Sequence, residues 1–261
     1  LTVADPWFRA VSLEYGSEGD VVMTDWSDTG ECHDRDGVHR SSGRIYRISY
    51  GDPRRVPANV RAASLSELVA LQFHPNDWFV RRARVVLQER AAAGVGFSDV
   101  HALLKAHVSD QPGTPQKLRA LWALHVTGGA SANWLRTLLG HPDEHLRHWA
   151  IRLLCDGAID PSTKAALVRL ASGETSWLVQ LALASALQRL PVEQRWALAQ
   201  PLVEACTPAT DPNLVRLLWY GLEPAVSLQP DAIAQSVANG SATRLKRLVT
   251  RRLAEALSTS S

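Results

Sequence analysis

The chain has 261 residues, of which 46% are hydrophobic and 21% are charged, and its formal net charge is +2. This length and apolar content are enough for one or two domains with buried cores. The nearly balanced charge provides no strong basic field of the kind that binds phosphate backbones, so we expect no nucleic-acid partner. No apolar run reaches about 18 residues, so we also expect no membrane span.

The first fifty residues are predicted to be rich in β-structure. Apolar side chains alternate over residues 11–15, residues 21–26 form a second extended run, and residues 43–50 alternate again. The glycine-rich stretch 16–20 between the first two runs predicts a turn, and hence a β-hairpin. We expect a small antiparallel sheet of three short strands, which buries little surface and must pack against a neighbour.

A dense polar loop, residues 25–40, joins the second and third predicted strands. It offers candidate ligands for a metal ion or a substrate: Asp28, Glu31, His33, Asp34, Asp36 and His39. Calcium would prefer the carboxylates and zinc the imidazoles, but the spacing matches neither metal's common signatures. The alternative is a loop held by its own side-chain hydrogen bonds. Catalysis by Cys32 with His33 is disfavoured, because adjacent side chains in an extended segment point apart.

A change of hydrophobic period marks the end of the β-rich part. Two prolines and two adjacent arginines between residues 52 and 57 are typical of an exposed linker. After it, the apolar residues repeat about every 3.6 positions, as in helices. We therefore predict a β-rich segment over 1–52, a linker over 53–63, helical repeats over 64–257 and a tail over 258–261.

Six helix pairs are predicted from residue 64 onward. The second helix of each pair carries an apolar residue followed by a basic or amide residue, and we call these six the ladder residues: Arg81, Arg119, Arg147, Gln180, Arg216 and Lys246. Spacings near thirty residues are typical of helical-pair repeats. The pattern resembles the HEAT-repeat family, which implies a mainly α fold with a short α–α solenoid. Facing outward, the ladder residues could bind an acidic protein partner; alternatively, they pair with carboxylates of adjacent repeats.

The predicted ends of several helices carry the expected residues. Asn76, Thr114, Asp143 and Asp211 each stand near the start of a helical pattern, and Gly94 follows the end of one. Two of the three cysteines, at positions 155 and 206, lie in apolar helical patterns and are expected in the core. The basic residues of the last helix suit a polar cap at the end of a repeat array.

A more specific resemblance lies in the β-rich part. The runs Asp5-Pro6-Trp7-Phe8-Arg9, Asp25 to Asp34 and His39 to Ile48 resemble the end of the β-propeller in membrane-bound dehydrogenases, large secreted bacterial proteins similar to soluble quinoprotein sugar dehydrogenases. In that family, a propeller precedes HEAT-like repeats and often a c-type cytochrome domain. The resemblance implies that residues 1–52 are a propeller-blade remnant. It also implies a periplasmic or extracellular location.

The sequence departs from that family in two respects. Most of the propeller is missing, and no Cys-x-x-Cys-His motif could attach haem. A quinone or haem would therefore belong to other parts of the parent protein, and the opening residues resemble no secretory signal, as expected for a piece of a larger or processed chain. We predict a non-catalytic module that docks a protein partner or a neighbouring domain. The alternatives are an oxidoreductase part completed by other segments, and a structural domain stabilised by calcium.

Overall fold

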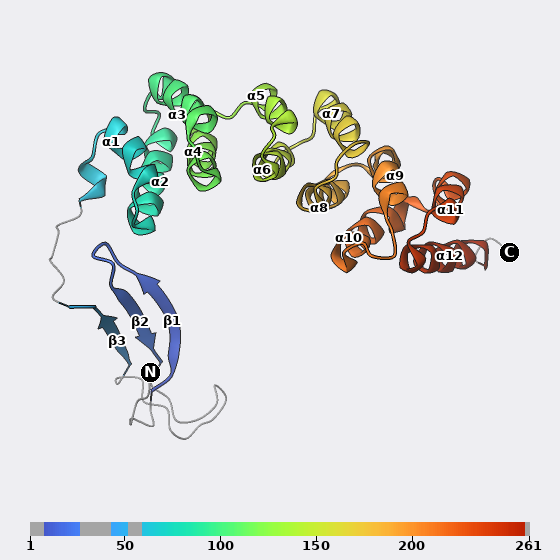
Figure 1. Cartoon of the computed structure of the whole chain (residues 1–261), viewed down its shortest axis with the longest axis horizontal. Helices are drawn as coiled ribbons and strands as arrows, with labels where there is room; N and C mark the ends of the chain where they lie inside the picture. The colour runs from blue at the N-terminus through green and yellow to red at the C-terminus, as the bar shows by residue number, and fades with distance from the viewer. Residues whose placement is uncertain (1–7, 27–42, 52–58, 259–261) are drawn as a thin grey trace. The chain divides into compact units, whose positions relative to one another are not determined.

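The structure is a computed structural model that describes residues 8–26, 43–51 and 59–258 (Figure 1). In this part of the chain it contains twelve α-helices and one three-stranded antiparallel sheet. The predicted class, mainly α with a small β element near the N-terminus, is confirmed at this level. Among the described residues, no helix is both long and apolar enough to cross a lipid bilayer.

The sheet has its strands in chain order, with β2 in the centre. Strand β1 spans Ala10–Tyr15, β2 spans Val21–Asp25 and β3 spans Arg44–Ile48. Both neighbouring pairs are antiparallel, so the predicted hairpin and third strand are confirmed. The register changes by one residue near the start of β1, which is a β-bulge at one end of the sheet.

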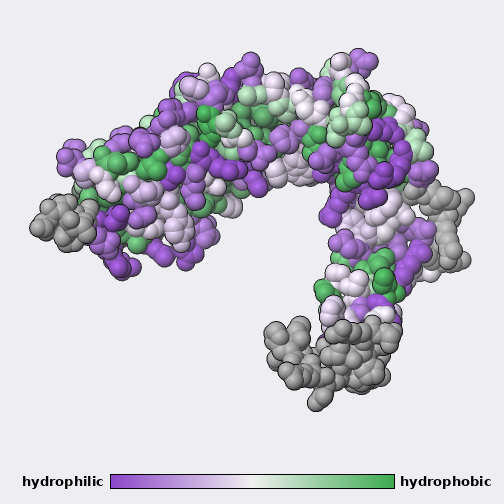
Figure 2. Space-filling model, turned by 180° about the vertical axis from the view of Figure 1, so that it is seen from behind, coloured by the Kyte–Doolittle hydropathy of each residue, from purple (hydrophilic) through white to green (hydrophobic). Residues whose placement is uncertain are grey.

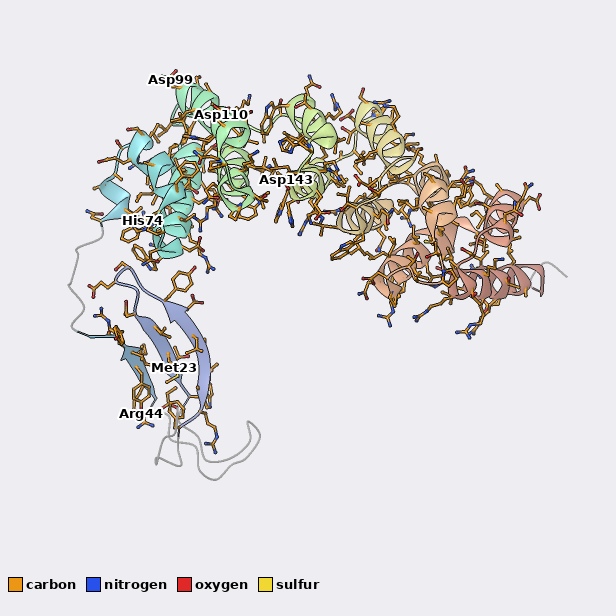
Figure 3. All side chains as sticks on the ribbon, in the orientation of Figure 1. Met23, Arg44, His74, Asp99, Asp110 and Asp143 are labelled. Atoms are coloured by element: carbon orange, nitrogen blue, oxygen red, sulfur yellow. The ribbon has the colours of Figure 1, made fainter. Side chains whose placement is uncertain are left out.

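One face of the sheet is apolar. Leu13, Met23 and Tyr46 lie side by side across the three strands, and Val21 and Ile48 lie beside each other in the same face. Met23, labelled in the middle of the sheet in Figure 3, is 4% exposed. By contrast, Leu13 is 65% exposed and Ile48 is 44% exposed. Figure 2 shows hydrophobic residues at the surface of the sheet.

The chain divides into two compact units, residues 1–106 and residues 107–261. The first unit holds the sheet together with α1 (Leu65–Ala70), α2 (Asp77–Ala92) and most of α3 (Ser98–Asp110). The division falls inside α3. Within the first unit, the sheet contacts the start of α2 through hydrogen bonds.

Those hydrogen bonds join the hairpin turn to the first residues of α2. The Tyr15 hydroxyl donates to Asp77 Oδ2 at 2.8 Å. Asn76 Nδ2 donates to the backbone oxygens of Gly16 and Ser17 at 3.0 and 3.1 Å. Asn76 also caps α2, because its Oδ1 accepts the Trp78 amide at 3.0 Å. One residue therefore fixes both the helix start and the turn.

The described half of the predicted linker also packs on α2. Val60–Ala62 form a single 3-10 turn, and the Val60 side chain is buried. Arg61 pairs with Glu89 at 2.9 Å, and Arg90 donates to the Arg61 oxygen at 2.9 Å. Residues 52–58 lie outside the described part of the chain.

The second unit is built from nine helices: α4 (Thr114–Val126), α5 (Ala132–Thr137), α6 (Glu144–Leu154), α7 (Pro161–Ala171), α8 (Trp177–Ala186), α9 (Arg195–Ala205), α10 (Pro212–Leu222), α11 (Pro230–Asn239) and α12 (Thr243–Ser258). The even-numbered helices contact one another in sequence, from α4 to α12. The odd-numbered helices do the same, from α5 to α11. Within this unit, each helix therefore packs on the helix two places along the chain.

The core between these helices is mainly leucine. Leu146, Leu183 and Leu218, one each from α6, α8 and α10, have no exposed surface. Gly221 of α10 lies against Leu187, since a Cβ at this glycine would come within 2.7 Å of the leucine side chain. Both predicted core cysteines, at positions 155 and 206, are buried.

The helix starts follow the capping chemistry that the sequence predicted. The Asp143 and Asp211 side chains each accept the backbone N–H two residues later, at 2.9 and 2.6 Å. Gly94 and Gly128, after the ends of α2 and α4, have φ values of 80° and 78°, where a side chain would be strained.

Candidate functional site

The predicted ligand residues of the polar loop lie outside the described part of the chain: Asp28, Glu31, His33, Asp34, Asp36 and His39. The calcium and substrate hypotheses for this loop therefore remain predictions. Within the described ranges, no group of three or more His, Cys, Asp or Glu side chains is arranged to hold a metal ion.

The described residues that flank the polar loop are held by an ion pair. Asp25, the last residue of β2, has a fully buried side chain, and its Oδ2 lies 2.8 Å from Arg44 Nη2 at the start of β3. Asp25 Oδ1 also accepts the Arg9 backbone N–H at 2.7 Å. Figure 3 labels Arg44 at this end of the sheet. A buried carboxylate with a guanidinium and an amide donor is well compensated, so this pair stabilises the end of the sheet where β2 ends and β3 begins.

A second ion-pair group lies at the opposite end of the sheet. The Arg47 guanidinium pairs with Glu18 and lies 2.6 Å from Asp20 Oδ2. Asp20 is buried, and its backbone oxygen accepts the Gly16 amide at 2.9 Å. The two ion pairs thus connect the hairpin turn to β3. The carboxylates of the described sheet thus serve its structure.

Among the ladder residues, Arg147 of α6 forms the most buried ion pair. Its Nε lies 2.8 Å from Glu174 Oε2, and its Nη2 lies 2.9 Å from Glu174 Oε1. The arginine side chain is 15% exposed and the glutamate 4%. Because Glu174 lies just before α8, the pair joins α6 to the segment that leads into α8.

The environment of Glu174 favours its charged form. Burial raises the pKa of this carboxyl, but the hydrogen bond from Arg147 and the backbone N–H of Ser176 lower it by more. The net pKa lies below the ordinary value of 4.5. The carboxylate is therefore charged at neutral pH and stabilises the junction between α6 and α8.

Three ladder residues donate hydrogen bonds back to the segment that precedes their own helix. Arg147 Nη1 donates to the His141 oxygen at 2.8 Å, and Gln180 Nε2 donates to the Glu174 oxygen at 2.8 Å. In both cases the acceptor lies six residues earlier. Lys246 Nζ donates to Ala238 at 2.7 Å. These long side chains thus connect their helices to the backbone that precedes them.

The other three ladder residues have different surroundings. Arg81 Nε lies 2.9 Å from Asp77 of its own helix, and its guanidinium lies over the Tyr15 ring at 5.1 Å. Arg216 donates to Asn213 at 3.3 Å, and Arg119 is half-buried on α4. The six positions share a location on even-numbered helices. They do not share one kind of contact.

A shared motif that the sequence analysis missed precedes α2 and α6. His74-Pro75-Asn76 and His141-Pro142-Asp143 are 67 positions apart. In each, the histidine Nδ1 accepts the backbone N–H two residues later at 3.0 Å, and the third residue caps the helix. The repeated His-Pro dipeptide was the available signal.

The same motif gives a second way to align α2 with α6. Its spacing of 67 residues places Arg147 at the position of Val80. Val80 is fully buried, whereas Arg147 forms the ion pair with Glu174. Equivalent positions of the two helices therefore have different surroundings in this alignment.

Polar contacts also connect the starts of three consecutive even-numbered helices. The Thr114 hydroxyl, at the start of α4, donates to Asp143 Oδ2 at 2.5 Å. Ser176, which caps α8, donates to Glu144 of α6. Asp143 and Ser176 each bond both to their own helix and to the preceding even-numbered helix, which connects α4 to α6 and α6 to α8.

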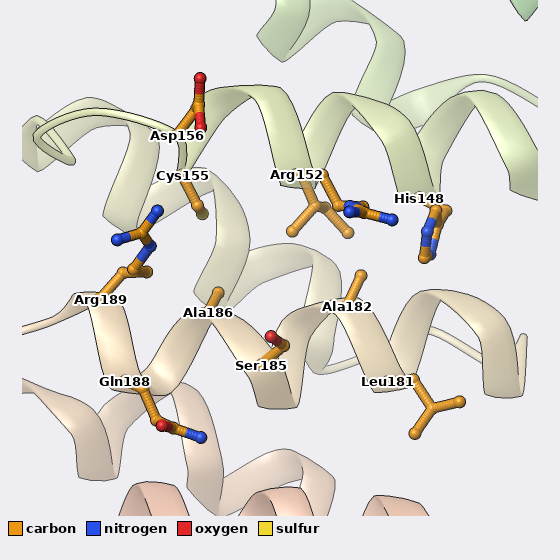
Figure 4. A pocket seen from close by; sticks show the side chains of 11 residues that line it. His148, Arg152, Cys155, Asp156, Leu181, Ala182, Ser185, Ala186, Gln188 and Arg189 are labelled. Carbon is orange, nitrogen blue, oxygen red and sulfur yellow. The ribbon is translucent and has the colours of Figure 1, made fainter. Parts of the chain in front are cut away.

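A groove lies at the other end of the same helices, between α6 and α8. It has a volume of about 470 Å³. Its floor consists of buried Ile151, Cys155, Ala182 and Ala186. Its rim consists of polar residues, most of them exposed, drawn in Figure 4: His148, Arg152, Asp156, Ser185, Gln188 and Arg189.

The cysteine in the groove is not a reactive thiol. Burial raises the pKa of Cys155 to about 11, although Arg189 acts in the opposite direction. Burial likewise raises the pKa of Cys206. Both side chains are therefore thiols at neutral pH, and neither is suited to nucleophilic attack.

No protein family model, curated protein or solved structure matches this chain. The fold and contacts define a mainly α-helical protein with a small antiparallel sheet. They leave its activity open to proposal.

Proposed function

We propose that the chain is a non-catalytic interaction module, in which a HEAT-like array of six helix pairs carries a small sheet that docks onto a β-domain. The observation that carries this proposal is the exposed apolar face of the sheet. Leu13 lies beside buried Met23 and Ile48 lies beside Val21 on the same face, yet Leu13 and Ile48 both remain open to solvent. Covering one such side chain contributes about 1.5–3 kcal/mol.

The strand edges support the same proposal. In the described sheet β1 and β3 each pair only with β2, so each has one edge of unpaired backbone groups. A three-stranded sheet with two open edges and an exposed apolar face has little stability of its own. An adjoining β-domain would cover the face and could pair with an edge strand.

The helical contacts support a repeat array as the scaffold. In the second unit, the odd-numbered helices pack on one another and the even-numbered helices pack on one another, so the chain alternates between two rows of helices. All six ladder residues fall on even-numbered helices, and the His-Pro cap occurs before two of them. Stacked helix pairs of this kind are typical of HEAT-like solenoids.

The resemblance of the β-rich part suggests the parent protein. We propose a bacterial protein similar to quinoprotein dehydrogenases, located in the periplasm or outside the cell, in which preceding propeller blades cover the sheet. Any quinone or haem would bind to those other parts. The oxidoreductase and calcium alternatives depend on the polar loop, which lies outside the described residues. Both remain predictions.

Two matched substitutions test the docking proposal. Leu13→Asp changes the apolar face, and Ile45→Asp changes the opposite face, where Ile45 is 75% exposed. Both should be made in this chain and in a longer form that includes the residues encoded before it. We expect Leu13→Asp to lower the thermal midpoint of the longer form much more than that of the chain, and Ile45→Asp to have similar small effects in both.

Either of two results would contradict the proposal. One is an equal effect of Leu13→Asp in the two forms. The other is a gene whose upstream sequence encodes no strand-rich domain, because the sheet would then have no neighbouring domain of its own parent.

A further inference from the structure

We propose that the groove between α6 and α8 binds an acidic peptide segment of a protein partner, with an apolar side chain on the floor and carboxylates at the two arginines. The groove is a hollow of about 470 Å³ within the second unit. That size falls in the range of small ligand pockets and accommodates one large side chain with its adjacent backbone. This inference does not depend on the docking of the sheet.

The floor of the groove is apolar, and three of its four residues are small. Ala182 and Ala186 of α8 lie opposite Ile151 of α6 and Cys155, which follows α6, and all four are buried. Small side chains along a helix pair leave a hollow that larger ones would fill. With the Cys155 thiol protonated, the floor carries no charge. An apolar side chain is the best-matched occupant.

Two guanidinium groups without carboxylate partners border this floor. Arg152 on α6 and Arg189 at the end of α8 form no ion pair within the described part of the chain. Figure 4 shows Arg152 extending from α6 and Arg189 from the α8 side into the space between the helices. Arginine binds carboxylates in a planar, bidentate geometry, so both groups are available to an acidic segment.

Arg152 is also held in place before any partner binds. Its guanidinium lies over the Trp149 ring, 4.6 Å from the ring centre. Trp149 in turn packs edge-to-face with Trp122, with ring centres 4.9 Å apart. A cation–π contact of this kind restricts the arginine without neutralising it, which lowers the entropy lost on binding.

The remaining rim residues favour a peptide over a simple anion. Ser185 and Gln188 offer hydrogen-bonding groups to a backbone or side chain. Burial lowers the pKa of His148, so its ring is neutral at pH 7 and adds no positive charge. Asp156 is negative and lies 3.9 Å from His125 Nε2. The rim thus carries two positive charges and one negative charge. This pattern suits a peptide whose carboxylates are spaced apart better than a phosphate ion, whose negative charge is concentrated in one group.

The test uses a fluorescein-labelled pentapeptide with a central leucine and two aspartates on either side. Its matched control peptide carries asparagine in place of every aspartate. We expect saturable binding of the acidic peptide to the full chain by fluorescence anisotropy, and at least tenfold weaker binding of the asparagine peptide. Arg152→Gln and Arg189→Gln should each weaken binding of the acidic peptide about tenfold.

The control substitution is Arg169→Gln, on the exposed surface of α7 outside the groove. It removes the same charge and should leave peptide affinity unchanged. Ser185→Leu should block the groove and abolish binding while the circular dichroism and thermal midpoint stay as in the unchanged chain. Equal binding of the two peptides, equal losses from Arg169→Gln and Arg152→Gln, or unaltered affinity after Ser185→Leu would each overturn the proposal.

Two other occupants are distinguished by the same assay. Complete displacement of the peptide by equimolar inorganic phosphate would assign the groove to simple anions. Self-association of the chain that Arg152→Gln and Arg189→Gln abolish, without peptide binding, would assign it to a second copy. Either result would overturn an acidic peptide as the partner.

Discussion

Arg147 holds both carboxylate oxygens of Glu174, at 2.8 and 2.9 Å, and so joins α6 to the start of α8. We predict that Glu174→Gln lowers the free energy of unfolding by about 3 kcal/mol, because it leaves a largely buried guanidinium without its counter-charge. Urea denaturation measures this change. The matched control is Glu89→Gln, which breaks the exposed Arg61 pair and should change little. Equal losses in the two variants would contradict a special role for the buried pair.

The stability should fall in two stages as the pH decreases. Burial lowers the pKa of His141 and His148 below the ordinary 6.5. The unfolded chain therefore takes up these protons first, and stability decreases as the pH falls through that region. Glu174 has a pKa below 4.5, so its contribution is present above that pH and is lost as the pH falls further.

Denaturation curves between pH 8 and pH 3 test both stages. The double variant His141→Asn/His148→Asn should remove the upper stage and leave the lower one. Glu174→Gln should reduce the lower stage alone. A stability profile that is flat between pH 8 and pH 5 would show that the two histidines do not titrate as described.

Gly221 is predicted to tolerate no side chain. Glycine to alanine usually favours a helix, but here the new Cβ would lie 2.7 Å from the Leu187 side chain. We expect Gly221→Ala to cost about 1–3 kcal/mol of stability, because α10 and α8 would have to separate. The control Gly157→Ala meets no atom within 4 Å and should have little effect.

A double variant with Leu187→Ala tests whether the loss of stability in Gly221→Ala comes from the contact with Leu187. Leu187→Ala alone leaves a cavity and is destabilising. In the double variant Gly221→Ala/Leu187→Ala the new methyl group occupies part of that cavity, so the combined loss should be smaller than the sum of the two single losses. Simple additivity would mean that the two residues do not contact each other.

The hydrogen bond between Tyr15 and Asp77 is predicted to hold the sheet on α2. Tyr15→Phe should accelerate hydrogen exchange in the hairpin turn at residues 16–20 without changing exchange in α6 or α8. The control Tyr50→Phe changes a fully exposed ring. Unchanged exchange in the turn after Tyr15→Phe would show that other contacts suffice.

The polar loop gives a prediction for metal removal. We expect the hydrogen-bonded form of the loop, and hence a thermal midpoint that neither rises with calcium nor falls with chelator. Mass spectrometry of the purified chain measures any bound ion. A stoichiometric ion that is lost together with stability would instead place ligands among residues 25–40.

Much of the fold was predictable because it depends on local patterns. The alternation over residues 11–15 and 43–50 and the caps at Asn76 and Asp143 are encoded within a few positions, and each corresponds to an observed element. The partner of Arg147 was not predictable, because Glu174 is 27 residues away and reaches it only through the packing of α6 on α8.

The groove was not predictable for the same physical reason. Cys155, just after α6, and Arg189, in the 3-10 turn after α8, both line it although all of α7 lies between them in the sequence. Their sequence patterns suggest only a core cysteine and a surface arginine.

Docking of the sheet on a β-domain is tested most directly by amide hydrogen exchange in β1 and β3, compared between this chain and a longer form with residues that precede it in its gene. We predict that amides on the open edges of these strands exchange at least tenfold more slowly in the longer form, because a neighbouring β-domain covers the face with Leu13 and Ile48 and pairs with an edge strand. Amides of α6 and α8 serve as an internal reference. Identical exchange of β1 and β3 in the two forms would show that no β-domain docks on the sheet.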